Sequence, residues 1–178
     1  LEGQSRWFSR FEAHLARQTI TDDRLTQEYA APEITREFNS SELDGLTLQF
    51  NSPWGHGGAE REWVWGFEYY TAEIASMRFR SSAAGSPELP VTARFPDGSS
   101  MDSAAVYASH HWGWERLTLD AGLRYSRFDV FLPASTEVAD VNLQPTDLTG
   151  DLHLGYELVP GTHLVANLGR GFRPPNVF

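Results

Sequence analysis

The sequence contains no cysteine and is poor in positive charge. The absence of cysteine excludes disulfides, thiolate metal sites and cysteine nucleophiles. Only 14 basic side chains oppose 24 acidic ones, which gives a formal net charge of −10. No basic tract is present, and a nucleic-acid backbone is bound by clustered cations. We therefore expect no nucleic-acid partner.

Long hydrophobic runs are also missing. No apolar stretch approaches the roughly 20 residues that a transmembrane helix requires, which excludes a helical membrane protein. A membrane β-barrel stays open, because its strands need only about 10 residues of alternating pattern. The chain starts at Leu1-Glu2-Gly3 without a signal peptide. For an exported protein, we expect this N-terminus to be internal to a longer precursor.

Signatures of catalysis are sparse. Asp22 and Asp23 are adjacent carboxylates in a predicted loop, without a supporting histidine or a nucleophile elbow. No glycine-rich phosphate loop precedes a helix. We expect no catalytic residues and no enzyme activity.

Alternation of apolar and polar residues dominates the chain, whereas no window of helical period carries caps at both ends. From Leu117 to Tyr125 every second residue is apolar and the intervening ones are polar or small. This pattern predicts an all-β protein whose strands have one apolar and one polar face. Seven strands are predicted, at residues 6–20, 41–52, 62–80, 102–112, 117–131, 147–158 and 162–171.

The predicted connections alternate strictly between long and short. Long polar links cover residues 21–40, 81–101 and 132–146, and short ones cover 53–61, 113–116 and 159–161. In an antiparallel up-and-down meander, all long links then lie at one end of the sheet and all short links at the other. Outer-membrane barrels sort their loops in this way. The order favours a transmembrane β-barrel over a β-sandwich.

The register of the last hairpin agrees with a meander. If a three-residue turn follows Leu158, that residue faces Thr162 and Leu154 faces Ala166, so that apolar side chains meet across the pair. A two-residue turn on Pro160-Gly161 fits turn chemistry better, but it would pair each apolar face with a polar one. We give more weight to the matching of faces.

Tryptophan placement provides a separate indication. In the predicted meander, all six tryptophans lie at the end of the short turns. Side chains of this type prefer the membrane interface, so one belt of them predicts the periplasmic girdle of a barrel. The alternative is an aromatic-rich sandwich core, which would place them in the middle of strands. The predicted girdle consists of Trp7, Trp54, Trp63, Trp65, Trp112 and Trp114.

Two segments resemble a known family. The strand Leu119-Asp120-Ala121-Gly122-Leu123-Arg124-Tyr125 resembles the recurring strand of TonB-dependent outer-membrane receptors, which ends in Gly-Leu-Arg-Tyr. The closing run Gly169-Arg170-Gly171-Phe172-Arg173-Pro174-Pro175-Asn176 is similar to the late-barrel motif of the same family. Pro174 stands where alanine is commoner, and a proline keeps the backbone extended.

The resemblance implies a partial barrel domain over residues 1–178, with about seven of the roughly 22 strands of a plugged outer-membrane barrel. It also implies an upstream plug that contacts the TonB energy-coupling complex. The cargo would be an iron chelate, either a ferric siderophore or haem, and no covalent cofactor is expected. Two alternatives are a passive outer-membrane porin and a secreted carbohydrate-binding β-sandwich.

The family motif also implies ligand-binding residues near the end of the chain. These are Arg170, Phe172, Arg173, Pro174, Pro175 and Asn176. A guanidinium can bind the carboxylates of a chelate, although Arg170 and Arg173 could instead pair with inward-facing acidic side chains.

Histidines on the predicted inner face invite a metal-site interpretation, which the register does not favour. His163 faces Glu157, and His14 lies far from both His153 and His163 along the sheet. His110 and His111 are adjacent, so their rings point to opposite faces of a strand. A metal site needs convergent ligands, and we therefore expect none.

Overall fold

The computed structural model describes residues 2–3, 8–53, 60–134 and 139–172. Within them, no helix has the length and apolar character needed to cross a membrane. The described secondary structure consists of ten strands, which are β1 (Glu2–Gly3), β2 (Arg10–Gln27), β3 (Ile34–Pro53), β4 (Glu60–Ser81), β5 (Leu89–Val91), β6 (Ser99–Trp114), β7 (Leu117–Leu132), β8 (Val141–Leu143), β9 (Thr146–Val159) and β10 (Thr162–Arg170).

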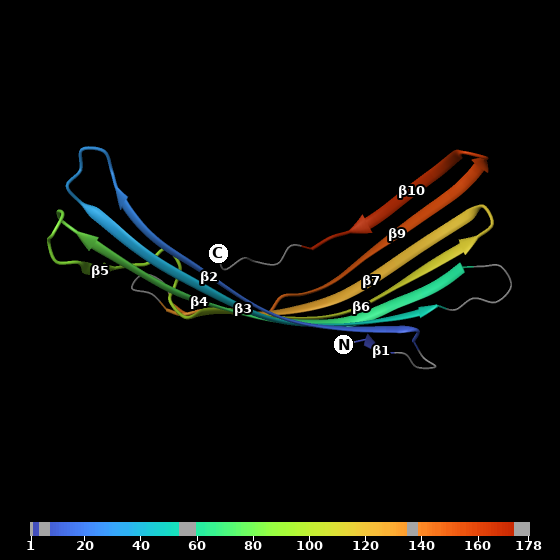
Figure 1. Ribbon diagram of the computed structural model, residues 1–178, viewed down its shortest axis with the longest axis horizontal. Coiled ribbons are helices and arrows are strands. Elements are labelled where there is room, and N and C mark those ends of the chain that lie inside the picture. The colour runs from blue at the N-terminus through green and yellow to red at the C-terminus, as the bar shows by residue number, and fades with distance from the viewer. Residues whose placement is uncertain (1, 4–7, 54–59, 135–138, 173–178) are drawn as a thin grey trace.

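All ten strands belong to one antiparallel sheet with the order β1-β2-β3-β4-β6-β7-β9-β10, while β5 pairs with β4 and β8 with β7. Figure 1 shows them as one curved layer, with the β9–β10 turn at one end and the β2–β3 connection at the other. The predicted all-β up-and-down meander is confirmed. The sandwich alternative is wrong, because these strands form a single sheet.

Each predicted strand matches one long strand, but the predicted loop at 21–40 is wrong. β2 and β3 continue through this segment and remain paired as far as Gln27 and Ile34. The apolar pattern fades there because the polar side chains of the segment lie on both faces. An ion pair between Asp23 and Arg36 supports the extension, with Nη2 of Arg36 2.8 Å from Oδ2 of Asp23.

We expect this ion pair to give the hairpin a pH-dependent stability. The hydrogen bond from Arg36 lowers the pKa of Asp23 below its ordinary value of 3.8. The stabilisation is therefore present above pH 3.8 and is lost as the pH falls through the lowered pKa. The effect should be small, because both side chains are about half exposed and water screens the pair.

The test is the thermal unfolding of the full-length protein and its Asp23→Asn variant, followed by circular dichroism over a pH series. The variant should melt slightly earlier above pH 3.8, and the difference should disappear on acidification. A difference that persists at the lowest pH would contradict this account.

The other two long links are only partly loop. β5 pairs with residues 78–80 of β4, beyond the point where β6 begins to pair with that strand. β8 occupies the corresponding place on β7, beyond β9. Each short strand therefore extends the sheet at the end of the long links.

The last hairpin combines both predicted turns through a β-bulge. Val159 pairs with Thr162 around the two-residue turn Pro160-Gly161, but Glu157 pairs with the next residue, His163. The extra residue is Leu158, so its predicted pairing with Thr162 is wrong. Beyond the bulge, Leu154 pairs with Ala166 as predicted. One inserted residue thus restores the match between apolar faces.

One face of the sheet is apolar and uncovered. Leu15, Leu123 and Leu168 are exposed by 84%, 62% and 74%. Their cross-strand neighbours, such as Leu46, Ala108 and Leu152, continue the same face from strand to strand. We call this the outer face. A single layer cannot bury it, so apolar surroundings would have to cover it.

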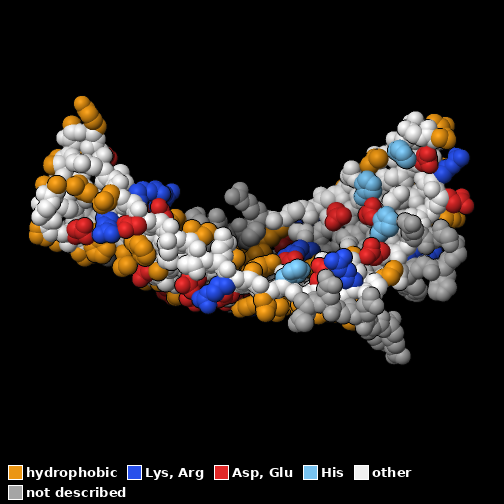
Figure 2. Space-filling model, viewed as in Figure 1, with side chains coloured by type: hydrophobic (Ala, Val, Ile, Leu, Met, Phe, Trp, Pro, Cys, Tyr) orange, Lys and Arg blue, Asp and Glu red, His pale blue; other side chains and the backbone are white. Residues whose placement is uncertain are grey.

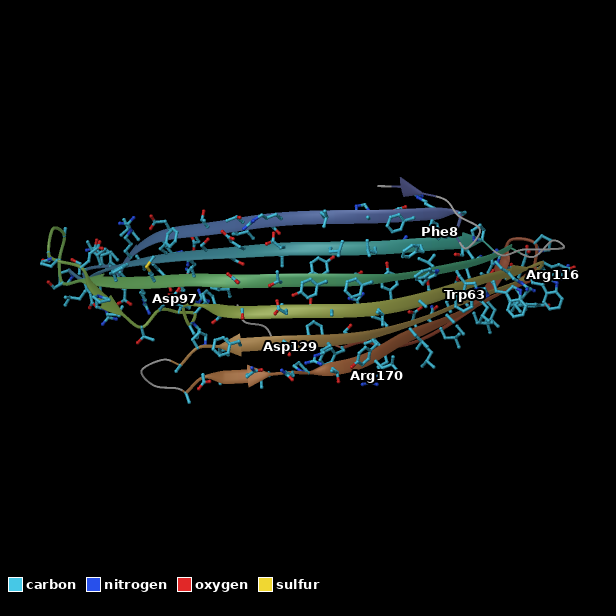
Figure 3. All side chains as sticks on the ribbon, turned by 90° about the horizontal axis from the view of Figure 1, so that it is seen from below. Phe8, Trp63, Asp97, Arg116, Asp129 and Arg170 are labelled. Carbon is cyan, nitrogen blue, oxygen red and sulfur yellow. The ribbon has the colours of Figure 1, made fainter. Side chains whose placement is uncertain are left out.

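The four described tryptophans lie on this outer face. Trp63 and Trp65 lie near the start of β4, and Trp112 and Trp114 lie at the end of β6. Figure 3 shows Trp63 toward the same end of the sheet as Arg116, far from Asp97. The predicted position at the short-turn end is therefore confirmed for these four. Trp7 and Trp54 lie outside the described residues, and the role of a membrane girdle stays a prediction.

Candidate functional site

The candidate site is the polar face opposite the outer face, which we call the inner face. Alternation directs Glu68 of β4, Tyr107 of β6 and Arg124 of β7 to this side, since Tyr107 pairs with Arg124 on β7 and with Gly66 on β4. In Figure 2, histidine and acidic side chains gather over the arm formed by β7, β9 and β10. In a closed barrel, this face would line the interior.

Arg124 occupies the middle of the inner face and reaches across β6 to β4. Its Nη2 donates to Oε2 of Glu68 at 2.7 Å, and its Nε donates to Oγ of Ser126 at 3.1 Å. The guanidinium carbon lies 6.0 Å from the ring centroid of Tyr107. The positive charge is thus held by a carboxylate, a hydroxyl and an aromatic face.

Two tyrosines continue the polar network toward β3. The hydroxyl of Tyr107 donates to Oε1 of Gln49 at 3.1 Å. The hydroxyl of Tyr70 shares a hydrogen bond of 3.1 Å with Oγ1 of Thr47. A line of hydrogen-bonded side chains therefore extends from β7 across β6 and β4 to β3.

The two tyrosine rings lie along the wall because each covers a glycine on the neighbouring strand. A Cβ atom at Gly45 would lie 2.7 Å from ring carbons of Tyr70. A Cβ atom at Gly66 would lie 2.7 Å from Cζ of Tyr107. Without these glycines, the rings would have to move away from the sheet and into the interior.

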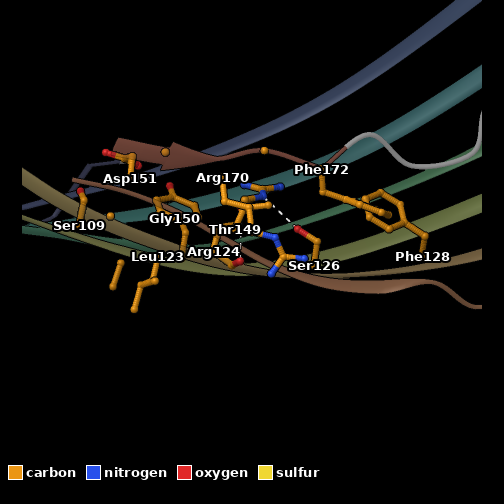
Figure 4. A pocket seen from close by; sticks show the side chains of 15 residues that line it. Ser109, Leu123, Arg124, Ser126, Phe128, Thr149, Gly150, Asp151, Arg170 and Phe172 are labelled. Carbon is orange, nitrogen blue, oxygen red and sulfur yellow. Dashed lines mark hydrogen bonds between the residues drawn. The ribbon is translucent and has the colours of Figure 1, made fainter. Parts of the chain in front are cut away.

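The family motif of the sequence lies beside this network. Residues Gly169, Arg170, Gly171 and Phe172 line a hollow of about 640 Å³ together with inner-face groups such as Arg124 (Figure 4). The predicted ligand-binding role is thus placed next to a cavity, but it stays a prediction.

The two described side chains of the predicted ligand set already have partners. Nη2 of Arg170 donates to Oδ1 of Asp147 at 2.6 Å. The ring of Phe172 lies 6.0 Å from that of Phe128 on the inner face. The other members of the set, Arg173, Pro174, Pro175 and Asn176, lie outside the described residues.

The histidines are separated as the register predicted. His163 pairs with Glu157 across the last hairpin. Nδ1 of His111 lies 2.5 Å from Oδ1 of Asp120 on the inner face, whereas the ring of His110 stacks on Trp63 on the outer face. Among the described residues, no group of three metal-binding side chains converges.

The inner face has one feature that sequence reasoning missed. Segment 92–98, predicted as part of a long loop, folds inward and places Phe95 against Ile74 and Val130, which are 3% and 2% exposed. Oδ1 of Asp97 accepts a hydrogen bond from the backbone N–H of Ser76 at 2.9 Å. The signal was a lone phenylalanine before the turn-forming run Pro96-Asp97-Gly98.

Comparison with protein families gives one match that covers almost the whole chain. The profile described as "TonB dependent receptor-like, beta-barrel" matches residues 2–178. No curated protein matches the sequence.

Solved structures of three transport proteins share the fold. The copper transporter OprC aligns with a TM-score of 0.82 at 17% identity, over 97% of this chain and 28% of its own. The ferric citrate transporter FecA, unliganded, aligns with a TM-score of 0.73 at 15% identity, over 89% and 24%. The siderophore receptor PiuA from Acinetobacter baumannii aligns with a TM-score of 0.57 at 12% identity, over 84% and 28%. The present chain spans about a quarter of the length of each.

Proposed function

The chain belongs to the TonB dependent receptor-like β-barrel family, and from this membership we propose that it forms part of a transporter that imports a metal chelate with energy supplied through TonB. Barrels of this family lie in the outer membrane, which is where this segment is located. TonB-dependent receptors are transporters and not enzymes, in agreement with the absence of catalytic signatures in the sequence.

The observation that carries the proposal is the family match over residues 2–178. The two faces of the sheet support it, since the outer face suits lipid and the inner face suits a polar interior. We further propose that the complete polypeptide contains a plug domain inside this barrel and that the plug contacts TonB. The ion-paired and hydrogen-bonded groups around Arg124 would then face the plug or the cargo.

For the cargo, we propose an iron chelate, either a ferric siderophore or haem. Two of the three related structures are a ferric citrate transporter and a siderophore receptor. The third is a copper transporter, so copper is the competing cargo to test. Of the motif residues, Arg170 and Phe172 line the inner-face hollow. We propose that they contact this cargo together with Arg173, Pro174, Pro175 and Asn176.

The proposal is tested by deleting the gene and measuring the uptake of radiolabelled iron and copper in cells with and without TonB. Iron should be supplied in turn as ferric siderophores, ferric citrate and haem. We expect one iron chelate to enter only when both the gene and TonB are present. Uptake that needs the gene but not TonB would favour a passive porin, and gene-dependent uptake of copper alone would replace iron as cargo.

A further inference from the structure

Most of the described arginines have a carboxylate partner. Among the described residues, Arg78 and Arg94 at the long-link end, and Arg61 and Arg116 at the other end, have no carboxylate oxygen within 4.0 Å. The paired ones are Arg10, Arg17, Arg24, Arg36, Arg80, Arg124, Arg127 and Arg170. In a chain with a net charge of −10, two unpaired guanidinium groups at one end of the sheet are unexpected.

Arg78 and Arg94 line the same hollow. It is an open hollow of about 1010 Å³, lined by the end of β4, by β5 and by the inward segment 92–98. Arg78 belongs to β4 and Arg94 to the inward segment, so the two cations come from different parts of the chain. Apolar side chains of Phe95 and Val91 form part of the wall.

The donors of these two side chains are available. The Nε atom of Arg78 is buried and has no hydrogen-bond partner. The guanidinium carbon of the exposed Arg94 lies 5.5 Å from the ring centroid of Phe95, a contact that orients the group. A buried donor without an acceptor is costly, so a ligand oxygen at this place would be stabilised.

Three described carboxylates, Asp22, Glu37 and Asp97, lie nearby, and none of them forms an ion pair with Arg78 or Arg94. Asp97 lines the same hollow, but one of its oxygens accepts the backbone N–H of Ser76. Glu37 is the cross-strand neighbour of Arg78, and its buried Oε1 has no partner. Glu37 lines an adjoining hollow together with Asp22, Arg94 and Phe95. A ligand with oxyanions could accept hydrogen bonds from the arginines, and its hydroxyl or amide groups could donate to the free carboxylate oxygen.

We propose that Arg78 and Arg94 bind a carboxylate of the imported metal chelate at the outer end of the barrel interior. This inference rests on the proposed transport function and narrows its cargo to chelates that carry free carboxylates. The planar guanidinium fork matches the two oxygens of a carboxylate, and two such forks select it over a neutral ligand. Segment 92–98 acts as the positioning element, because it places Arg94 opposite β4.

The test uses the purified full-length receptor in detergent, with ferric citrate as the carboxylate probe and a neutral ferric trihydroxamate as the comparison. Binding is measured by tryptophan fluorescence for the wild type and for the double variant R78Q/R94Q. We expect the Kd for ferric citrate to rise about 10-fold or more, because two charge-assisted hydrogen bonds are lost. The Kd for the trihydroxamate should not change.

Matched variants separate this effect from general loss of charge or of folding. R36Q/R127Q removes the same number of charges from the outer face, where both arginines are paired with aspartates, and should bind ferric citrate as the wild type does. R78K/R94K keeps the charge but loses the bidentate fork, and should give an intermediate Kd. Thermal unfolding of each variant shows whether it is folded.

Equal affinity of the wild type and R78Q/R94Q for ferric citrate would overturn the inference. So would a wild type that binds and imports the neutral chelate but not ferric citrate, in which case the proposed transport function stands. A wild type that imports no metal chelate in TonB-containing cells overturns the transport function and the inference with it.

Discussion

Replacement of Leu152 by arginine should lower the stability of the folded barrel in a membrane by about 2–4 kcal/mol. Leu152 lies on the outer face and is 43% exposed. It pairs with Ala121 on one side and with Leu168 on the other, so its surroundings on this face are apolar. An arginine there would place its charge in hydrocarbon, where no water or carboxylate can solvate it.

The expected loss of stability is large because Leu152 lies deep within the apolar band of the outer face. On β7 the apolar band of the outer face runs from Leu117 to Tyr125, and Ala121 is at its centre. This segment is about 27 Å long at roughly 3.4 Å per residue. Tilted by about 40°, it would span about 20 Å of a membrane, close to the band of about 25 Å that is typical of such barrels. Leu152, the cross-strand neighbour of Ala121, therefore lies near the middle.

His153→Arg is the matched control, because it lies one residue further along the same strand and points to the inner face. Its cross-strand neighbour is Asp120, a carboxylate that an arginine can reach. We expect a much smaller change, since inner-face substitutions meet water and polar groups. The measurement is urea unfolding of the full-length receptor in lipid vesicles. Equal losses for both variants would mean that the outer face does not contact lipid.

The strands and their faces were predictable because lipid imposes a strict rule on one side of the sheet. Along Leu117–Leu132, each apolar side chain of the predicted band lies on the outer face, and Arg124 lies on the inner face as predicted. Short turns such as Glu115-Arg116 allow little choice of register, so neighbouring strands were also placed correctly.

The same rule explains where prediction failed. Beyond the apolar band, β2 and β3 continue with polar side chains on both faces, so the pattern of residues 21–40 resembled a loop. The bulge at Leu158 was missed because a two-residue turn fitted the turn chemistry and a three-residue turn matched the apolar faces, but neither did both. The extra residue that reconciles the two does not change the alternation of apolar and polar residues.

The site was only partly predictable. Alternation assigns Glu68 and Arg124 to polar faces, but their ion pair crosses an intervening strand and depends on the curvature of the sheet. The inward fold of segment 92–98 depends on contacts of Phe95 with residues on β4 and β7, which are distant in sequence. The sequence motif left open whether Arg170 contacts a ligand or pairs with an inward-facing acidic side chain, and its partner Asp147 is visible only in the structure.

The contact between Gly66 and Tyr107 was likewise hidden in the sequence, and Gly66→Ala should destabilise the protein by about 3 kcal/mol. The added Cβ would lie 2.7 Å from Cζ of Tyr107 and too close to the backbone carbonyl oxygen of Leu48 for any non-bonded contact. The tyrosine ring can rotate away, but the carbonyl can move only if β3 and β4 separate. The variant should therefore lose stability even after the ring has moved.

Gly155→Ala is the matched control for this substitution. It also lies on the inner face within a strand, but its Cβ would meet no atom closer than 3.6 Å. Alanine costs less backbone entropy than glycine, so this variant should be as stable as the wild type or slightly more stable. Chemical denaturation of both full-length variants provides the comparison. Equal stabilities would show that a Cβ atom at position 66 causes no strain.

A double-mutant cycle with Tyr107→Ala separates the two clashes at Gly66. Removal of the ring should relieve part of the loss caused by Gly66→Ala, so the two substitutions should couple favourably. The remaining loss measures the contact with the backbone of Leu48. If the ring swings into the barrel interior in Gly66→Ala, it also loses its hydrogen bond to Gln49. Chelate uptake should then fall in Gly66→Ala and recover in the double variant, because no ring is left to project into the interior.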